Sequence, residues 1–289
     1  MTALTLPHVT AAIAAIYTFG FGIIAVLALI PARRKDAFEF GTTLATATAL
    51  IATLTVLFWL GETALLVAMP AIVARISYEA AIVRVPSKRF SLFLSLAAGA
   101  MTIATMLYEL GTLTVLGLFF IALARQIIGR RTAIASTLIF PILPAILLAS
   151  GTVSPAFGAV LLATYLMVEI FDSFALFFGA MWGRTKAFPT LSPNKTVEGL
   201  LGGGFALLTL SLITAAILGL PLLPTALTAL IVGAMAVVGD LAASRHKRIA
   251  GVKDYPQVLP RQGGLLDSLD SWIAAGAGLT ALHTVAQLW

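Results

Sequence analysis

The amino-acid sequence predicts an all-α polytopic membrane protein with about ten transmembrane helices. Hydrophobic residues make up 60% of the 289 residues, charged residues make up only 10%, and the mean hydropathy is +1.04. An ordinary soluble domain carries about 25% charged residues, so this composition excludes one. Apolar runs of roughly 20 residues, the length that a helix needs to cross a bilayer, recur along the whole chain, and the alternating segments of a membrane β-barrel do not occur.

The apolar runs define the helices that we expect, in chain order. They lie at about residues 8–30, 38–60, 63–82, 90–108, 112–124, 132–149, 156–182, 197–218, 222–238 and 266–289. Pro141 and Pro144 fall inside the sixth run and are expected to kink it, because proline interrupts the hydrogen-bond ladder of a helix. Ser192 and Pro193 are expected to form the N-cap and the first position of the eighth helix.

The basic residues support this helix count. With the N-terminus outside, all eighteen Lys and Arg residues fall on one side of the membrane or at its boundary, and the opposite turns hold Glu62, Glu109 and otherwise uncharged residues. The positive-inside rule makes the basic side cytoplasmic. We therefore expect a multi-pass protein of the inner (cytoplasmic) membrane with both termini outside. Two polar stretches, residues 183–204 and 239–271, then share the cytoplasmic side.

The same topology explains the basic pI near 9.9, so the charge does not indicate nucleic acid as a partner. The chain has no cysteine, which excludes disulfides, a thiolate metal site and a cysteine nucleophile. The N-terminal residues carry no basic flank before the first apolar run, so we expect that run to be a retained helix and not a cleaved signal peptide.

Five acidic residues lie at membrane depth or at its cytoplasmic boundary. Glu169 and Asp172 are three residues apart in the seventh helix and share a face, Asp267 and Asp270 repeat this spacing where the tenth helix begins, and Asp240 ends the ninth. A charged side chain at the bilayer centre costs about 2.5–3.5 kcal/mol on insertion scales, so such residues usually face a cavity and have a partner. We expect these carboxylates to converge.

Spacing alone leaves two interpretations of the acids open. In the first, a divalent cation such as Mg²⁺, which prefers oxygen ligands, relieves their mutual repulsion. In the second, Asp267 and Asp270 only favour the N-terminal end of a helix dipole, and Asp240 pairs with Arg245 or Lys247.

Basic residues and glycines beside the acids favour a site for phosphates. Cations neutralise phosphate charge, and glycines let backbone N–H groups approach it closely. These residues are Lys195, Arg245, Lys247, Arg248, Lys253 and Arg261, with Gly199, Gly202, Gly203, Gly204, Gly263 and Gly264. The combination is typical of phosphoryl or nucleotidyl transfer. A glycine run in a membrane helix also serves close helix packing. A membrane cation or proton transporter that uses the same carboxylates is the alternative from another class.

The two polar stretches together resemble the phosphatidate cytidylyltransferase (CDP-diacylglycerol synthase) family over about the last 130 residues. The family signature S-x-x-K-R-x(4)-K-D-x(4)-[LI]-P-G-H-G-G-x-x-D-R-x-D is matched without a gap by Ser244, Lys247, Arg248, Lys253, Asp254, Leu259, Pro260, Gly263, Gly264, Asp267 and Asp270. The family's G-D-L, S-P-x-K-T-x-E-G and G-[KR] motifs are similar to residues 239–241, 192–199 and 183–184, and Asp172 falls where the family has an aspartate.

Three departures make the chain a divergent relative in this comparison. Arg261 and Gln262 stand where the family has Gly-His, Ser268 replaces the arginine between the two aspartates, and Ala243 replaces an acid.

The resemblance implies a transferase of phospholipid biosynthesis that transfers a cytidylyl group from CTP to phosphatidate, or to a related lipid phosphate, giving CDP-diacylglycerol and pyrophosphate. It implies Mg²⁺, with room for a second monovalent or divalent cation, and it allows contacts with membrane lipids and a homodimer. The alternatives are a CTP-dependent lipid kinase, a cytidylyltransferase with another lipid acceptor, and an inactive paralogue. The resemblance divides the chain into N-terminal scaffold helices (1–150) and a catalytic region (151–289) with cytoplasmic loops 183–199 and 240–266.

The resemblance also assigns roles to single residues. Asp240, Asp267, Asp270 and Asp172 are the expected metal ligands. The expected catalytic residues are Asp240, Lys247, Arg248, Lys253, Asp254, Asp267 and Asp270. The expected substrate-binding residues are Ser192, Lys195, Thr196, Glu198, Ser244, Gly263, Gly264 and Arg261.

Overall fold

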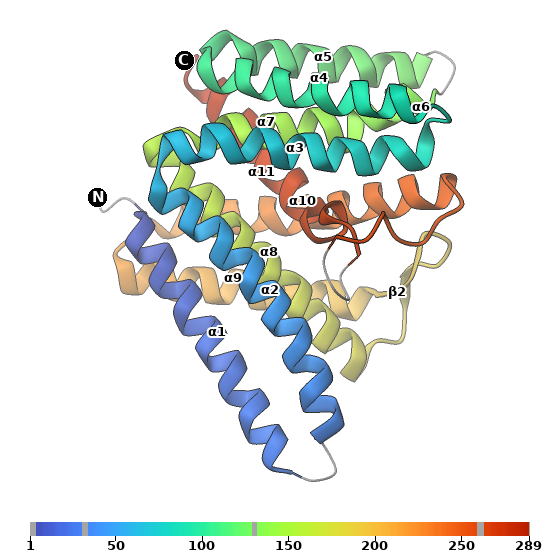
Figure 1. Cartoon of the computed structure of the whole chain (residues 1–289). Coiled ribbons are helices and arrows are strands. Elements are labelled where there is room, and N and C mark those ends of the chain that lie inside the picture. Colours follow the sequence, from blue (N-terminus) through green and yellow to red (C-terminus); the bar gives the residue numbers. More distant parts are fainter. Residues whose placement is uncertain (1–3, 31–33, 129–131, 259–262, 289) are drawn as a thin grey trace.

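The computed structural model describes residues 4–30, 34–128, 132–258 and 263–288, and it is almost entirely helical (Figure 1). The elements in chain order are α1 (Leu6–Leu29), α2 (Arg34–Leu60), α3 (Glu62–Arg84), α4 (Lys88–Leu107), α5 (Glu109–Ile128), α6 (Ala133–Thr137), η2 (Leu138–Ile142), α7 (Leu143–Thr152), α8 (Pro155–Trp182), β1 (Lys186–Phe188), β2 (Ser192–Thr196), α9 (Val197–Leu218), α10 (Leu222–Ile249) and α11 (Leu265–Ala286).

The predicted all-α membrane fold is confirmed. The described residues form ten helices when α6, η2 and α7 are counted as one interrupted helix. Within the same residues, 8 helices are long and apolar enough to cross a membrane. The interruption is where proline was expected to act: Phe140, next to Pro141, has the non-helical angles φ −152° and ψ 127°. Pro144 instead sits in the first turn of α7, where proline is tolerated.

The predicted end of the ninth helix is wrong. It was expected near residue 238, but α10 continues to Ile249, so residues 240–249 are helical and not part of a loop. The extension is rich in alanine and basic residues, which are good helix formers, and its last turn holds His246, Lys247 and Arg248 near the negative end of the helix dipole. The helix thereby carries Asp240 inside its length and not at its end.

The predicted cap of the eighth helix is also wrong. Ser192 and Pro193 lie in β2, which pairs antiparallel with β1 in a two-stranded sheet that the hydropathy pattern did not predict. The N-cap of α9 is Thr196, whose Oγ1 accepts a hydrogen bond from Gly199 N at 3.2 Å. Each strand is too short for period-two alternation to be visible in the sequence.

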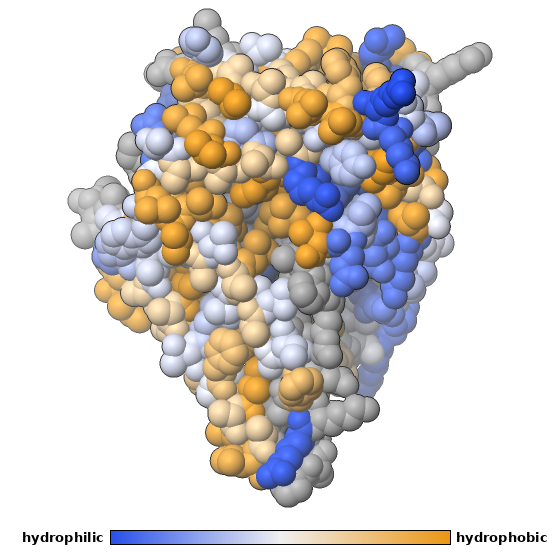
Figure 2. Space-filling view, in the orientation of Figure 1, coloured by the Kyte–Doolittle hydropathy of each residue, from blue (hydrophilic) through white to orange (hydrophobic). Residues whose placement is uncertain are grey.

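The turns alternate between two ends of the molecule (Figure 1). Those after α2, α4, α7 and α9 lie toward the left of the view together with both chain termini. Those after α3, α5 and α10, and the β-hairpin after α8, lie toward the right, and the turn after α1 lies at the lower tip. Most strongly hydrophilic residues of this face lie toward the right (Figure 2). The structure therefore places the two polar stretches at the same end.

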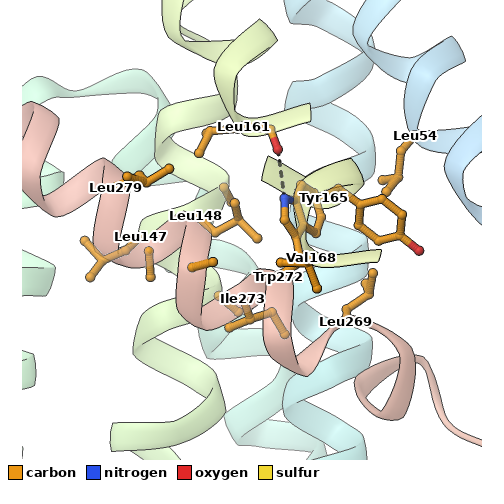
Figure 3. Packing of buried hydrophobic residues seen from close by; sticks show 14 of the residues in the cluster. Leu54, Leu147, Leu148, Leu161, Tyr165, Val168, Leu269, Trp272, Ile273 and Leu279 are labelled. Carbon is orange, nitrogen blue, oxygen red and sulfur yellow. Dashed lines mark hydrogen bonds between the residues drawn. The ribbon is translucent and has the colours of Figure 1, made fainter. Parts of the chain in front are cut away.

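A core of buried apolar side chains holds α8 and α11, two of the helices that carry the acidic residues, against each other. Trp272 of α11 is 1% exposed, and its Nε1 donates a hydrogen bond to Leu161 O of α8 at 2.9 Å (Figure 3). Tyr165 of α8 meets the Trp272 ring edge-on at a centroid distance of 5.5 Å. Gly276 of α11 lies so close to Leu148 of α7 that a side chain there would collide with it. These contacts set the spacing of α11 from both α8 and α7.

Glu79 of α3 joins the N-terminal half of the chain to the start of α11. Its carboxylate is fully buried and accepts hydrogen bonds from Leu265 N at 3.2 Å, from Leu266 N at 2.9 Å and from Arg75 Nε at 2.8 Å. It thus satisfies two N–H groups that the first turn of a helix leaves without intrahelical partners. The carboxylate also complements the positive end of the α11 dipole.

We predict that Glu79→Ala destabilises the protein by about 3 kcal/mol, because two buried N–H donors and a guanidinium lose their acceptor. For a protein of this size, the thermal midpoint in detergent should then fall by roughly 5–10 °C. Glu62→Ala is the matched control, since Glu62 is an exposed acid at the start of the same helix. Equal midpoints for the two variants would contradict the capping role.

Candidate active site

The predicted convergence of the acids occurs in one cavity of about 230 Å³ between α8, α10 and α11. Five carboxyl groups line it. The lining residues are Tyr165, Val168, Glu169 and Asp172 of α8, Asp240 of α10, and Asp267, Ser268, Asp270 and Ser271 of α11. We call this the acidic cavity. The spacing of three residues in α8 and in α11 turns both carboxylates of each pair toward the same space.

A second cavity of about 380 Å³ adjoins the acidic cavity, because Asp172 lines both. Its remaining lining residues are Ala175, Leu176, Gly179 and Ala180 of α8, Ser192, Asn194, Lys195 and Thr196 of β2, and Leu200 of α9. We call it the hairpin cavity. Its lining brings the second polar stretch against the acids, as the resemblance implied for Ser192, Lys195 and Thr196.

An ion pair connects the two cavities. Lys195 Nζ of β2 lies 3.0 Å from Asp240 Oδ2 of α10, and Lys195 is also close enough to Asp172 to attract it. The contact is not a hydrogen bond, and Asp240 Oδ2 is buried without accepting one. The expected pairing of Asp240 with Arg245 or Lys247 is therefore wrong. Those cations are closer in sequence, but Lys195 is the partner in the folded chain.

Asp267 has the most complete set of partners in the acidic cavity. Its Oδ1 lies 2.6 Å from Lys247 Nζ, and its Oδ2 accepts hydrogen bonds from Tyr255 N at 3.0 Å and Gly264 N at 2.9 Å. The interpretation of Asp267 as a residue that favours a helix N-terminus is thus correct. It does not exclude a catalytic role, because the same carboxylate lines the cavity beside Asp270, which is 8% exposed.

The glycine pair before α11 is required by close packing around Asp267. Gly263 has φ +86°, and a Cβ there would lie 2.6 Å from Asp267 Oδ2. A Cβ on Gly264 would lie 2.6 Å from Glu79 Oε2. The pair therefore lets two carboxylates approach the same helix start.

The glycines at the start of α9 serve helix packing. A Cβ on Gly199 would lie 2.6 Å from Ala175 O, and one on Gly203 would lie 2.7 Å from Phe171 O. Both carbonyls belong to α8, so these glycines let α9 approach it closely. For these two positions the structure supports the packing interpretation.

A series of hydrogen bonds between buried side chains holds the loop after α10 against α6. The hydroxyl of Tyr255 is 3.1 Å from His246 Nδ1, and His246 Nε2 is 3.2 Å from Thr137 Oγ1 of α6. The Tyr255 ring lies 5.3 Å from Lys247 Nζ. Burial raises the pKa of Tyr255 far above its usual range, so its hydroxyl stays protonated. The sequence did not predict this series of hydrogen bonds, because His246 and Thr137 are 109 residues apart. It did not predict the bonds of Glu79 to the start of α11 either, because these partners are also far apart in the sequence.

Several expected site residues lie outside both cavities. Lys253 and Asp254 are exposed in the loop after α10, and Arg248 donates to Val252 O at 3.4 Å. Glu198 accepts hydrogen bonds from Arg184 N and Thr185 N and so fixes the start of the β-hairpin. Ser244 is half-buried on α10 and lines neither cavity. Arg261 lies outside the described residues, as does Gln262.

The acidic cavity has the donor chemistry of a Mg²⁺ site. Carboxylate oxygens are hard ligands, and Asp240 Oδ2 is a buried oxygen without a hydrogen bond. Within the described ranges, no three acidic or histidine side chains come close enough together to hold a metal ion unaided. Mg²⁺ is usually held by one or two carboxylates with waters and substrate phosphates. The residues therefore fit a metal only if other ligands complete its coordination.

Comparisons with known proteins agree with this geometry. The profile of the Cytidylyltransferase family matches residues 42–286, which extends well upstream of the region recognised from motifs. A phosphatidate cytidylyltransferase of Staphylococcus aureus (strain COL) is 38% identical over 115 residues, which are 39% of this chain and 44% of that protein. One of Staphylococcus haemolyticus is 36% identical over 115 residues, again 44% of its length.

The uncharacterized protein YnbB of Escherichia coli (strain K12) is 40% identical over 119 residues, 40% of each chain. The chain thus spans less than half the length of these curated relatives. The family profile covers most of the chain, including every helix that lines the acidic cavity. This chain belongs to the cytidylyltransferase family.

Proposed function

We propose that this protein transfers the cytidylyl group of CTP to phosphatidate or a related lipid phosphate, giving CDP-diacylglycerol or its analogue and pyrophosphate. The observation that carries the proposal is the acidic cavity, joined to the hairpin cavity through Asp172 and through the ion pair of Lys195 with Asp240. Family membership and the names of the relatives support CTP as the nucleotide.

The reaction is a displacement at phosphorus. An oxygen of the lipid phosphate forms a bond to the α-phosphorus of CTP, and the bond from that phosphorus to the oxygen bridging it to the β-phosphate breaks. Pyrophosphate leaves with the electron pair. The attacking phosphate is already an anion, so the reaction needs no general base and no covalent protein intermediate. Catalysis then consists of positioning and of charge neutralisation.

Lys195 and Lys247 are suited to neutralise the charge of the phosphates. In the structure, Lys195 and Lys247 each neutralise one aspartate, at 3.0 and 2.6 Å. Asp240, Asp267, Asp270 and Asp172 would hold Mg²⁺, which would supply charge neutralisation at the phosphates when bound. A cation on these carboxylates would leave Lys195 and Lys247 available to bind phosphate oxygens directly. Arg248, Lys253 and the exposed loop would contribute to the approach of CTP.

The proposed site lies where both substrates have access. The acidic cavity adjoins the hairpin cavity, which residues of the β-hairpin line. The positive-inside rule predicts that the end of the molecule with this hairpin faces the cytoplasm. CTP would enter from the cytoplasm, and the lipid would enter sideways from the bilayer.

The purified protein in detergent should release pyrophosphate from CTP only when phosphatidate and Mg²⁺ are both present. Asp240→Asn and Asp267→Asn should each lower the rate at least roughly 100-fold, because each removes charge from the group that orients the phosphates. Glu62→Gln should keep the wild-type rate, since Glu62 is exposed at the other end of the molecule.

Product analysis makes this assay decisive. Release of CDP in place of pyrophosphate would identify a CTP-dependent lipid kinase. Absence of CTP binding together with absence of pyrophosphate release for every lipid phosphate tested would contradict the proposal and favour an inactive paralogue or a transporter.

The topology has its own test, because the chain contains no cysteine and single cysteines can be added. Val258→Cys, in the exposed loop after α10, should react with a membrane-impermeant maleimide in inverted vesicles and not in intact cells. Glu62→Cys, at the first residue of α3, should show the opposite pattern. Labelling of both positions from the same side would refute the arrangement.

A further inference from the structure

Arg84 at the end of α3 forms no ion pair with an acidic residue in the described parts of the chain. Its Nη2 donates to Ser136 Oγ at 3.2 Å, and its Nε is buried without a hydrogen-bond partner. Ion pairs among the described residues join Arg75 to Glu79, Lys195 to Asp240 and Lys247 to Asp267, and none involves Arg84. A guanidinium with a buried, unsatisfied N–H is costly unless an anion meets it.

This guanidinium lines a cavity of about 310 Å³ that is separate from the acidic cavity. Arg245 of α10 and Gln126 of α5 also line it, and Gln126 Oε1 is another buried polar atom without a partner. No carboxylate is among the described lining residues. We call it the arginine cavity. Two arginines, a glutamine, Ser136 and His246 therefore line one space, and no acidic residue of the described parts of the chain joins them.

The arginine cavity lies on the opposite side of α10 from the acidic cavity. Leu241, Ala242 and Arg245 of α10 line the former, whereas Asp240 lines the latter. The two cavities share no lining residue. Ligands of the arginine cavity therefore do not need the acidic cavity, and this inference is independent of the proposed reaction.

The rest of the cavity wall is apolar. Leu123 of α5, Phe140 of η2 and Ile249 of α10 are among the residues that form it. Its lining includes the last residues of α3 and α10, Arg84 and Ile249, which lie at the end of the molecule toward the right of Figure 1. An apolar wall beside two arginines is the setting that suits an anionic head group carrying hydrocarbon, because membrane anions bind basic pockets between helices on the cytoplasmic side.

We propose that the arginine cavity binds the phosphate of an anionic membrane lipid, with Arg84 and Arg245 as the phosphate ligands and the apolar wall against the lipid's glycerol and upper acyl chains. Arginine binds phosphate oxygens through two parallel N–H groups. Arg84 retains its Nε for this purpose, because only its Nη2 is engaged by Ser136. The lipid completes the hydrogen bonding of Arg84 and fills the space between α3, α5 and α10.

The test measures binding of short-chain phosphatidylglycerol to the full chain in detergent by native mass spectrometry. This lipid carries a phosphodiester, so it lacks the free phosphate that the proposed reaction consumes. The double variant Arg84→Gln/Arg245→Gln should bind it at least roughly tenfold more weakly, because charged hydrogen bonds are lost. Arg89→Gln, which removes an exposed arginine at the start of α4, is the matched control and should bind it like the wild type.

Three further measurements test the same site with a conservative variant, an uncharged lipid and inorganic phosphate. Arg84→Lys keeps the charge and should lose less affinity than Arg84→Gln, which separates binding from a folding defect. Short-chain phosphatidylcholine, which has no net charge, should bind wild type and double variant equally. Inorganic phosphate should not displace phosphatidylglycerol. Displacement by phosphate alone, equal affinity in the double variant, or an equal loss in Lys195→Gln would each overturn the proposal, the last because it would place the lipid at the hairpin cavity.

Discussion

Five carboxyl groups share one cavity of about 230 Å³ between three helices, and the packing of these helices holds the groups together despite their mutual repulsion. Carboxylates at such close quarters repel one another, and burial makes each charge more costly. Two lysines offset part of this cost, one from β2 and one from the same helix as Asp240. A site with surplus acidic charge is suited to a cation that arrives with its substrate, which is the basis of the proposed chemistry.

The acids stay close only because other parts of the chain hold α8, α10 and α11 in place. Trp272 ties α11 to α8 through Leu161 O, and Glu79 ties the start of α11 to α3. Tyr255 and His246 connect the loop after α10 to α6 through Thr137. The N-terminal half is therefore more than a membrane anchor, since it supplies the carboxylate and the hydroxyl that position the start of α11 and the loop before it.

Much of the fold and part of the site could be predicted from the sequence. Helix number follows from apolar runs of bilayer length, and the convergence of Asp172, Asp240, Asp267 and Asp270 follows from their spacing together with the family motifs. The partner of Asp240 could not be predicted, because local spacing favours Arg245 or Lys247. The observed partner, Lys195, comes from β2, which packs against α8 and α9 and meets Asp240 of α10 through this ion pair.

Other differences have the same origin in packing. The polar composition of residues 240–249 concealed the continuation of α10, although its alanines and basic residues are good helix formers. The role of Gly199 and Gly203 depends on how closely α8 approaches α9, which motif spacing does not reveal. The capping role of Glu79 could not be predicted from local spacing, which shows only its pairing with Arg75, because the N–H groups that it caps lie 186 and 187 residues further along the chain.

Binding of Mn²⁺, a paramagnetic substitute for Mg²⁺, shows whether the acidic cavity holds a metal ion together with CTP. Titration followed by electron paramagnetic resonance should show that CTP tightens Mn²⁺ binding to the wild-type protein, because triphosphate oxygens complete the coordination that the carboxylates begin. The double variant Asp240→Asn/Asp267→Asn should lose this CTP-dependent binding. Unchanged Mn²⁺ affinity in the double variant, or no effect of CTP in the wild type, would contradict the account of the acidic cavity as a metal and triphosphate site.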